Sequence, residues 1–284
     1  MAREELSYCA VQVRRHDHDR FLTCLFAPAG MREHLFALYA FNLEVARTAE
    51  SVSEPMLGQI RLQWWRECLA EIFAGRPRRH EVVEPLAAAI EAGGLPPPLF
   101  ERLIDAREAD LEPEPPADLA GLEAYAEATA GTLLSLALGM LMKRDGEDEE
   151  CQAVARHLGI AWALTGLLRA VPFHALQKRL YLPRDLTAAE GLDLGDLFEM
   201  KTSPALSRVA AVVAHAAAGH LERARRLSGA VPRQARSPLL LSVLARRYLV
   251  RLAQTGHDPF EPLVQTQLTT AAWRLTLASL LGRY

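Results

Sequence analysis

The chain has 284 residues, of which 50% are hydrophobic and 24% are charged, and its formal net charge is -3. These values predict a folded protein with a sizeable core and exclude an intrinsically disordered chain. The near-neutral balance of charge gives no reason to expect a nucleic-acid partner. The four cysteines form no Cys-x-x-Cys pair: Cys9, Cys24, Cys68 and Cys151. Their scatter argues against a zinc site or a disulfide framework and fits a reducing compartment.

The first residues, MAREELSYCA, lack the apolar segment of a secretory signal. Glu4 and Glu5 are also unusual in a mitochondrial presequence, which is normally poor in acidic residues. The longest apolar runs, residues 133–142 and 209–218, are shorter than the roughly 20 residues that span a bilayer. We therefore expect no transmembrane segment.

Apolar residues at three- and four-residue spacing predict helices along most of the chain. The first is residues 35–45, with Leu35, Leu38, Phe41 and Val45, and the second is residues 60–73. Residues 122–142 are almost uniformly apolar, which is typical of a core helix. Further helices are expected at residues 156–168, 206–227, 238–253 and 265–281. Because few stretches alternate as strands do and no break is long enough to be a linker, we predict one all-α domain, residues 1–284, of about ten helices.

Two stretches hold most of the informative side chains, residues 38–52 with 61–67 and residues 164–183. Together with Phe26-Ala-Pro and residues 125–134, they resemble the squalene/phytoene synthase family of head-to-head prenyl synthases. The resemblance implies an isoprenoid-synthase-like helical bundle around a central cavity. It also implies two aspartate-rich helical motifs that hold Mg²⁺, because ionising an allylic diphosphate requires hard cations on its oxygens.

In this chain the motif aspartates are nearly all replaced. The first motif would fall on Ala46, Arg47, Thr48, Ala49 and Glu50, and the second on Ala170 and His174. Glu50 alone keeps a carboxylate, and Arg47 places a positive charge where a metal would bind. On a continuous helix, Glu44 would lie on a different face from Glu50. We therefore expect no metal site, no cofactor and no catalytic residue, with Mg²⁺ only if the chain is an active synthase.

A narrower resemblance rests on residues 41–46, 51–54, 104–111 and 168–174. These resemble the mitochondrial respiratory complex I assembly factor 6 family, in which the aspartate motifs are eroded. Pro172 is part of this pattern and predicts that its helix ends or kinks before His174. The resemblance implies a non-catalytic role in building complex I, with a complex I subunit or assembly intermediate as partner. It implies a cytoplasmic bacterial protein, with inner-membrane peripheral contact, or a mature mitochondrial matrix form.

Two other functions remain open. One is an isoprenoid- or lipid-binding module, because the small residues within 133–139 and 210–219 allow either a cavity or close helix packing. The other is an atypical prenyltransferase whose metal ligands have moved to Glu44, Glu50, Asp105 or Asp110. This alternative requires carboxylates from different helices to converge.

Several side chains could line a cavity or bind an anion: Tyr39, Asn42, Glu50, Arg169, His174, Lys178 and Arg179. Lys178 and Arg179 match the basic part of the family motif, yet they could equally be solvent-facing cations at a helix end. His174 alone could be a ligand, a base or a structural residue.

Two further clusters have simple structural interpretations. His16-Asp-His-Asp has the composition of a metal-site fragment, but no matching downstream set accompanies it, so a solvated helix start is expected. Trp64 and Trp65 are predicted to pack in the core, with at most one of them exposed.

Overall fold

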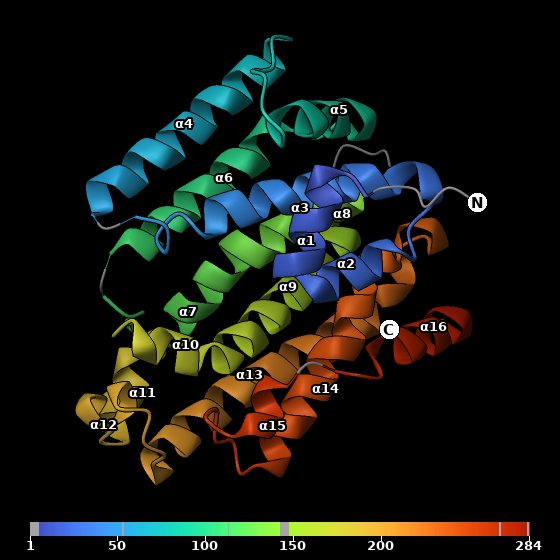
Figure 1. The fold of residues 1–284 in the computed structure, drawn as a ribbon. Helices are drawn as coiled ribbons and strands as arrows, with labels where there is room; N and C mark the ends of the chain where they lie inside the picture. Colours follow the sequence, from blue (N-terminus) through green and yellow to red (C-terminus); the bar gives the residue numbers. More distant parts are fainter. Residues whose placement is uncertain (1–5, 53, 113, 143–147, 267, 283) are drawn as a thin grey trace. The chain divides into compact units, whose positions relative to one another are not determined.

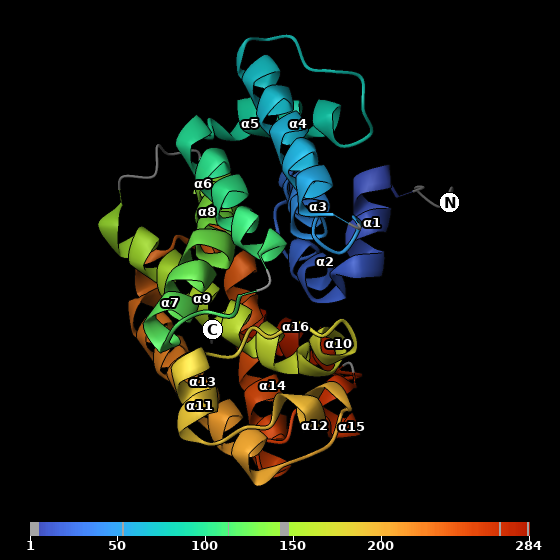
Figure 2. The ribbon, with the colours of Figure 1, turned by 90° about the vertical axis from the view of Figure 1, so that its left-hand side faces the viewer.

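The computed structural model describes residues 6–52, 54–112, 114–142, 148–266, 268–282 and 284, and among these it contains helices but no strand. Figures 1 and 2 show these helices from two directions. Contacts group the chain into two compact units, which are described separately below. Unit 1 comprises the described residues of 1–112, 132–152 and 229–241, and unit 2 those of 113–131, 153–228 and 242–284. That residues 1–284 form one domain stays a prediction.

Unit 1 is built around helix α3. Its elements are α1 (Tyr8–His16), α2 (His18–Cys24), η1 (Ala29–Met31), α3 (Arg32–Ala46), α4 (Pro55–Phe73), α5 (Val83–Gly93), α6 (Pro97–Glu108), η2 (Ala109–Leu111), α8 (Thr132–Met142), η5 (Arg233–Ala235) and η6 (Ser237–Leu240). Helix α3 packs against α1, α5 and α8. The four apolar residues whose spacing predicted it, Leu35, Leu38, Phe41 and Val45, are all buried.

An aromatic cluster fills the core of unit 1. The Trp65 ring meets the Phe41 ring edge to face at 5.2 Å between centroids, and Phe41 meets Phe100 at 5.6 Å. Trp65 is fully buried, whereas Trp64 is half-buried and contacts Trp65 at 4.9 Å. The prediction that both tryptophans pack, with at most one exposed, is confirmed.

The acidic and histidine-rich segment near the N-terminus is a junction between two helices. Helix α1 ends at His16, and Asp17 caps α2 by accepting a hydrogen bond from the Arg20 backbone N–H. The Asp17 carboxylate also pairs with the Arg20 guanidinium at 2.5 Å. The expected helix start is therefore confirmed, but Asp17 is mostly covered by protein and not solvated.

Unit 2 has a core formed by α9, α13 and α14. Its elements are α7 (Leu119–Ala126), the π-helical turn η3 (Glu127–Gly131), α9 (Glu149–Arg169, which begins in unit 1), α10 (Val171–Leu176), α11 (Arg184–Ala189), α12 (Leu194–Phe198), α13 (Pro204–Leu227), α14 (Leu241–Gln254), α15 (Pro262–Gln265) and α16 (Ala271–Leu281); η4 (Ser228–Ala230) lies at its boundary. Leu164, Val209, Val213 and Leu252 belong to one buried cluster. Burial of such apolar faces is the main stabilising contribution to a helical core.

Helix α9 lies against the π-helical turn with no space for a side chain. A Cβ atom on Gly159 would lie 2.3 Å from the Gly131 Cα atom and 2.7 Å from the Ala130 carbonyl carbon. An ion pair between Arg156 and Glu127, at 2.8 Å, joins the same two segments. Glycine at 159 is thus required by close approach of two backbones.

The predicted apolar helix at 122–142 is confirmed as the continuous run Leu119–Met142, which includes the π-helical turn. Among the described residues, this run alone is long and apolar enough to cross a membrane by length and composition. The sequence prediction of no transmembrane segment rested on shorter apolar runs and did not anticipate a helical run of this length. However, 67% of its most apolar window is buried within the fold, as in a core helix.

Two sequence predictions about helices are wrong. The described residues form sixteen α-helices instead of about ten, because elements such as α10, α11 and α12 have only 6, 6 and 5 residues. A helix of five or six residues is too short to be recognised from the periodicity of its apolar residues. The predicted helix at 265–281 is divided into α15 and α16, and Thr266 has an extended backbone between them.

Candidate functional site

The segment at the first motif is not a continuous helix. Helix α3 ends at Ala46, and Arg47 caps it with its backbone N–H donating to the Leu43 carbonyl at 3.1 Å. Residues 47–50 form turns. The separation of Glu44 and Glu50 by helical geometry is therefore a wrong premise, because Glu50 lies beyond the helix.

Each of the two carboxylates in this segment has an arginine partner. Glu44 accepts a hydrogen bond from Arg61 at 2.5 Å, and Arg61 also donates to the Ser51 hydroxyl at 3.2 Å. Glu50 forms a looser pair with Arg47, 3.9 Å between Nε and Oε2. Glu44 and Glu50 are therefore each matched by one guanidinium group.

The remaining carboxylates considered as relocated metal ligands are also paired in unit 1. Asp105 accepts from Arg66 at 2.7 Å, and Arg66 binds Glu108 at 2.6 Å as well. Asp110 is buried and accepts from Arg107 at 3.1 Å. Among the described residues, no three His, Cys, Asp or Glu side chains converge as metal ligands.

Two candidate cavity residues lie on the buried side of α3. Tyr39 and Asn42 are both buried, and burial holds the pKa of the Tyr39 hydroxyl far above its usual value. The Arg20 guanidinium lies over the Tyr39 ring, 5.6 Å from its centroid. These contacts make both residues part of the core of unit 1.

The second motif lies at a break between two helices of unit 2. Helix α9 ends at Arg169, and α10 begins at Val171 with Pro172 in its first turn. Proline is tolerated there because the first backbone N–H groups of a helix have no intrahelical acceptor. The prediction that Pro172 ends the helix before His174 is confirmed.

The basic end of the second motif is set by the cap of α10. Lys178 adopts a left-handed conformation with φ of 54°, and the Arg179 N–H donates to the His174 carbonyl at 2.9 Å. This is a Schellman cap. Lys178 is exposed, whereas Arg179 is half-buried beside His174 and Tyr181.

The candidate side chains of the second motif pack against aromatic rings. The His174 and Tyr181 rings lie 4.5 Å apart, and with Arg179 they line a cavity of only about 10 Å³. That volume admits at most one water molecule. The Arg169 guanidinium lies 3.6 Å from the centroid of the buried Tyr248 ring, a cation–π contact within unit 2.

The model of the family described as squalene/phytoene synthase matches residues 13–275 of this chain. The chain belongs to the squalene/phytoene synthase family. Two solved structures share the fold: a squalene synthase from Alicyclobacillus acidocaldarius (TM-score 0.77, 23% identity, 88% of this chain and 94% of that one) and a dehydrosqualene synthase bound to a ligand (TM-score 0.83, 17% identity, 97% and 95%). The predicted all-α isoprenoid-synthase fold is confirmed.

The family relatives of this chain have two kinds of name. NADH dehydrogenase (ubiquinone) complex I, assembly factor 6 of Bos taurus is 31% identical over 98% of this chain and 82% of its own length. The Homo sapiens protein of the same name is 30% identical over 92% and 78%. Presqualene diphosphate synthase of Sinorhizobium fredii is 29% identical over 86% and 87%. The predicted resemblance to both groups is confirmed.

This member of the squalene/phytoene synthase family also has a histidine pair that the sequence did not reveal. The Nδ1 atoms of His157 on α9 and His220 on α13 lie 2.9 Å apart, so one ring donates and the other accepts. The His220 Nε2 atom lies 3.4 Å from Glu123. The two histidines are 63 residues apart in the chain, and no local pattern could have linked them.

We expect this histidine pair to make stability depend on pH. Burial lowers the pKa of His157 and of His220 below the ordinary imidazole value of 6.5. A neutral buried histidine stabilises the fold above pH 6.5, and that stability is lost as the pH falls toward the lowered folded-state pKa. The free energy of unfolding should therefore decline between pH 7 and pH 5, by up to about 1.4 kcal/mol per pH unit for each proton.

Urea titrations at several pH values would measure this decline in the wild type and in the double variant His157→Gln, His220→Gln. The double variant should be less stable at pH 7 but show a shallower decline. His34→Gln, outside the pair, serves as the control and should keep the wild-type slope. An unchanged slope in the double variant would contradict the assignment.

Proposed function

We propose that this protein assists the assembly of respiratory complex I and does not condense prenyl diphosphates. Its partner in this proposal is a subunit or an assembly intermediate of complex I. The place of action is the inner membrane of a bacterium, on the cytoplasmic side, or of a mitochondrion, on the matrix side. The similarity to complex I assembly factor 6 proteins at 30–31% identity over almost the whole chain supports this role.

The observation that carries the non-catalytic part is the pairing of carboxylates with arginines. Hard divalent cations bind through several oxygen ligands, usually including carboxylates. Here Glu44 is paired with Arg61 and Glu50 with Arg47. The acidic positions of the second motif are Ala170 and His174, which supply no carboxylate. A cation at the first motif would have to displace a guanidinium and would lie beside its positive charge. The side chains at this site do not fit Mg²⁺, and we propose no cofactor.

A prenyltransferase is the second candidate, because presqualene diphosphate synthases are 29% identical to this chain. It requires a diphosphate site that does not use the paired carboxylates.

An isoprenoid-binding module without catalytic activity is the third candidate. It predicts that farnesyl diphosphate raises the melting temperature of the protein in the absence of magnesium, and an unchanged melting temperature at high ligand concentration would count against it.

The assembly role is tested in a strain that lacks the gene. We expect the membranes to lose most of their NADH:quinone oxidoreductase activity and their fully assembled complex I on native gels. Succinate dehydrogenase activity should stay unchanged, and a plasmid copy of the gene should restore complex I. If the deletion strain contained a normal amount of assembled complex I, the proposed role would be refuted.

A further inference from the structure

Helix α16 in unit 2 is apolar on two opposite faces. The inner face packs on the fold through Ala271, Leu275 and Ala278, which are buried. The outer face carries large apolar side chains with high exposed fractions: Trp273 (68%), Leu277 (44%), Leu280 (79%) and Leu281 (54%). Their spacing of four, three and one residues places them on one stripe of the helix. Apolar side chains this exposed contribute little to the core, and a contiguous exposed apolar patch is typical of an interaction surface.

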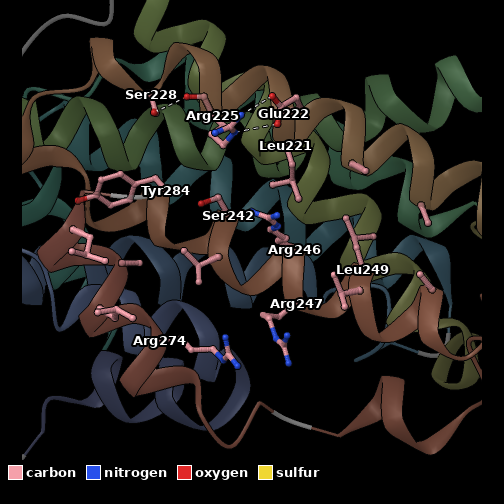
Figure 3. A pocket seen from close by; sticks show the side chains of 18 of the residues that line it. Leu221, Glu222, Arg225, Ser228, Ser242, Arg246, Arg247, Leu249, Arg274 and Tyr284 are labelled. Carbon is pink, nitrogen blue, oxygen red and sulfur yellow. Dashed lines mark hydrogen bonds and ion pairs between the residues drawn. The ribbon is translucent and has the colours of Figure 1, made fainter.

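The same helix forms one wall of a groove with α13 and α14. The groove has a volume of about 1320 Å³, and its apolar lining includes Leu221, Leu249 and Leu277 (Figure 3). Its polar lining is dominated by four arginines: Arg225, Arg246, Arg247 and Arg274. Figure 3 shows Arg246 and Arg247 projecting from α14 and Arg274 from α16.

Three of these arginines have no carboxylate partner among the described residues. Arg225 is paired with Glu222 at 2.9 Å, which accounts for the acidic residue of the groove. Arg274 donates to the Thr270 hydroxyl at 3.1 Å. The Nε atom of Arg247 is buried without a hydrogen-bond partner. Since α16 contains no acidic residue, the groove and the stripe together present uncompensated positive charge beside exposed apolar surface.

We propose that α16 and the adjoining arginines bind a bilayer surface that contains acidic phospholipid. Tryptophan and leucine on one side of an interfacial helix enter the boundary between headgroups and acyl chains. Arginines beside such a helix attract anionic headgroups, and each guanidinium binds phosphate oxygens. Arg246, Arg247 and Arg274 supply the cations, and the stripe from Trp273 to Leu281 supplies the apolar contact. The inference rests on the peripheral location included in the proposed function, and it names the surface responsible.

The charge distribution favours a membrane over a second copy of this chain. A symmetric pairing of this face would bring two sets of arginines together, and the Glu222 carboxylate of the groove is already paired with Arg225, so the pairing is unfavourable. An acidic bilayer provides negative charge across its whole surface, together with an apolar layer for the stripe.

The test is co-sedimentation of the purified full chain with vesicles. One set is phosphatidylcholine alone, and the other is phosphatidylcholine mixed with phosphatidylglycerol. We expect binding to the acidic vesicles to be at least about tenfold tighter, and to weaken as salt is added. The double variant Arg246→Gln, Arg274→Gln should weaken it about 30-fold, since each cation contributes about fivefold. The double variant Leu277→Gln, Leu280→Gln should weaken binding to both vesicle types about tenfold or more.

Met56 and Ile60 on α4 provide a matched control, because they are exposed apolar residues on a helix of unit 1. Met56→Gln, Ile60→Gln should bind vesicles as the wild type does, and equal melting temperatures would verify that all variants fold. Absence of vesicle binding, equal binding by the α16 variants, or loss of binding only in the α4 variant would each overturn the inference. These results would not alter the complex I phenotype of the deletion strain, so the two proposals fail separately.

Discussion

Replacing Trp65 with alanine should destabilise unit 1 by about 3–5 kcal/mol. The ring is only 1% exposed, and it meets Phe41 and Trp64 edge to face. Alanine would remove these ring contacts and leave a cavity among side chains from α3 and α4. The loss has two parts, since the apolar surface of the ring is no longer buried and the cavity can relax only in part.

The neighbouring residue is the matched control for this substitution. Trp64 is the same residue type on the same helix but is half-buried. Trp64→Ala should therefore cost clearly less stability than Trp65→Ala in urea unfolding followed by circular dichroism. Equal costs, or a Trp65→Ala variant as stable as the wild type, would contradict the packing of this core.

Gly159→Ala should destabilise the fold by about 2–3 kcal/mol, although alanine normally favours a helix over glycine. The added Cβ atom would lie 2.3 Å from the Gly131 Cα atom, a distance that non-bonded carbon atoms do not adopt. The obstacle is the backbone of Ala130 and Gly131, so no side-chain rotation relieves it. Helix α9 would have to move away from the π-helical turn.

Gly166, seven residues further along α9, is the control. A Cβ atom there would meet nothing within 4 Å. Gly166→Ala should therefore stabilise the protein by up to about 1 kcal/mol through helix propensity alone. Opposite signs for the two substitutions in thermal unfolding would support the close approach at Gly159. A stabilising Gly159→Ala would contradict it.

Periodicity was sufficient to predict the all-α class because long periodic segments define most of the core, whereas the isoprenoid-synthase-like bundle was implied by the resemblance to the family. The buried positions of α3 are those that its three- and four-residue spacing indicated, and α9 and α13 lie where the pattern placed them. Pro172 also marked a helix end correctly, since proline cannot occupy a helix interior without loss of a hydrogen bond. The break between α15 and α16 was missed, because residues 265–281 contain neither proline nor glycine.

The sequence could not predict which side chains pair with one another in the fold. Glu44 and Arg61 are 17 residues apart and meet only because α4 follows α3 after a turn. The exposed stripe of α16 could not be separated from its buried face, because both faces are apolar in sequence. Side-chain pairing and exposure depend on which face of a helix packs against the rest of the chain. Periodicity predicts which residues share a face of a helix, but it does not predict which other element that face contacts.

The most direct test of whether this protein condenses prenyl diphosphates is a product assay. The purified protein would be incubated with labelled farnesyl or geranylgeranyl diphosphate, magnesium and NADPH, beside a presqualene diphosphate synthase as the positive control. We predict no release of diphosphate and no coupled prenyl product above a blank without protein, because Glu50, the one carboxylate left in the first motif, and the nearby Glu44 are each paired with an arginine. Diphosphate release together with a head-to-head prenyl product would contradict the account and would identify this chain as an active synthase.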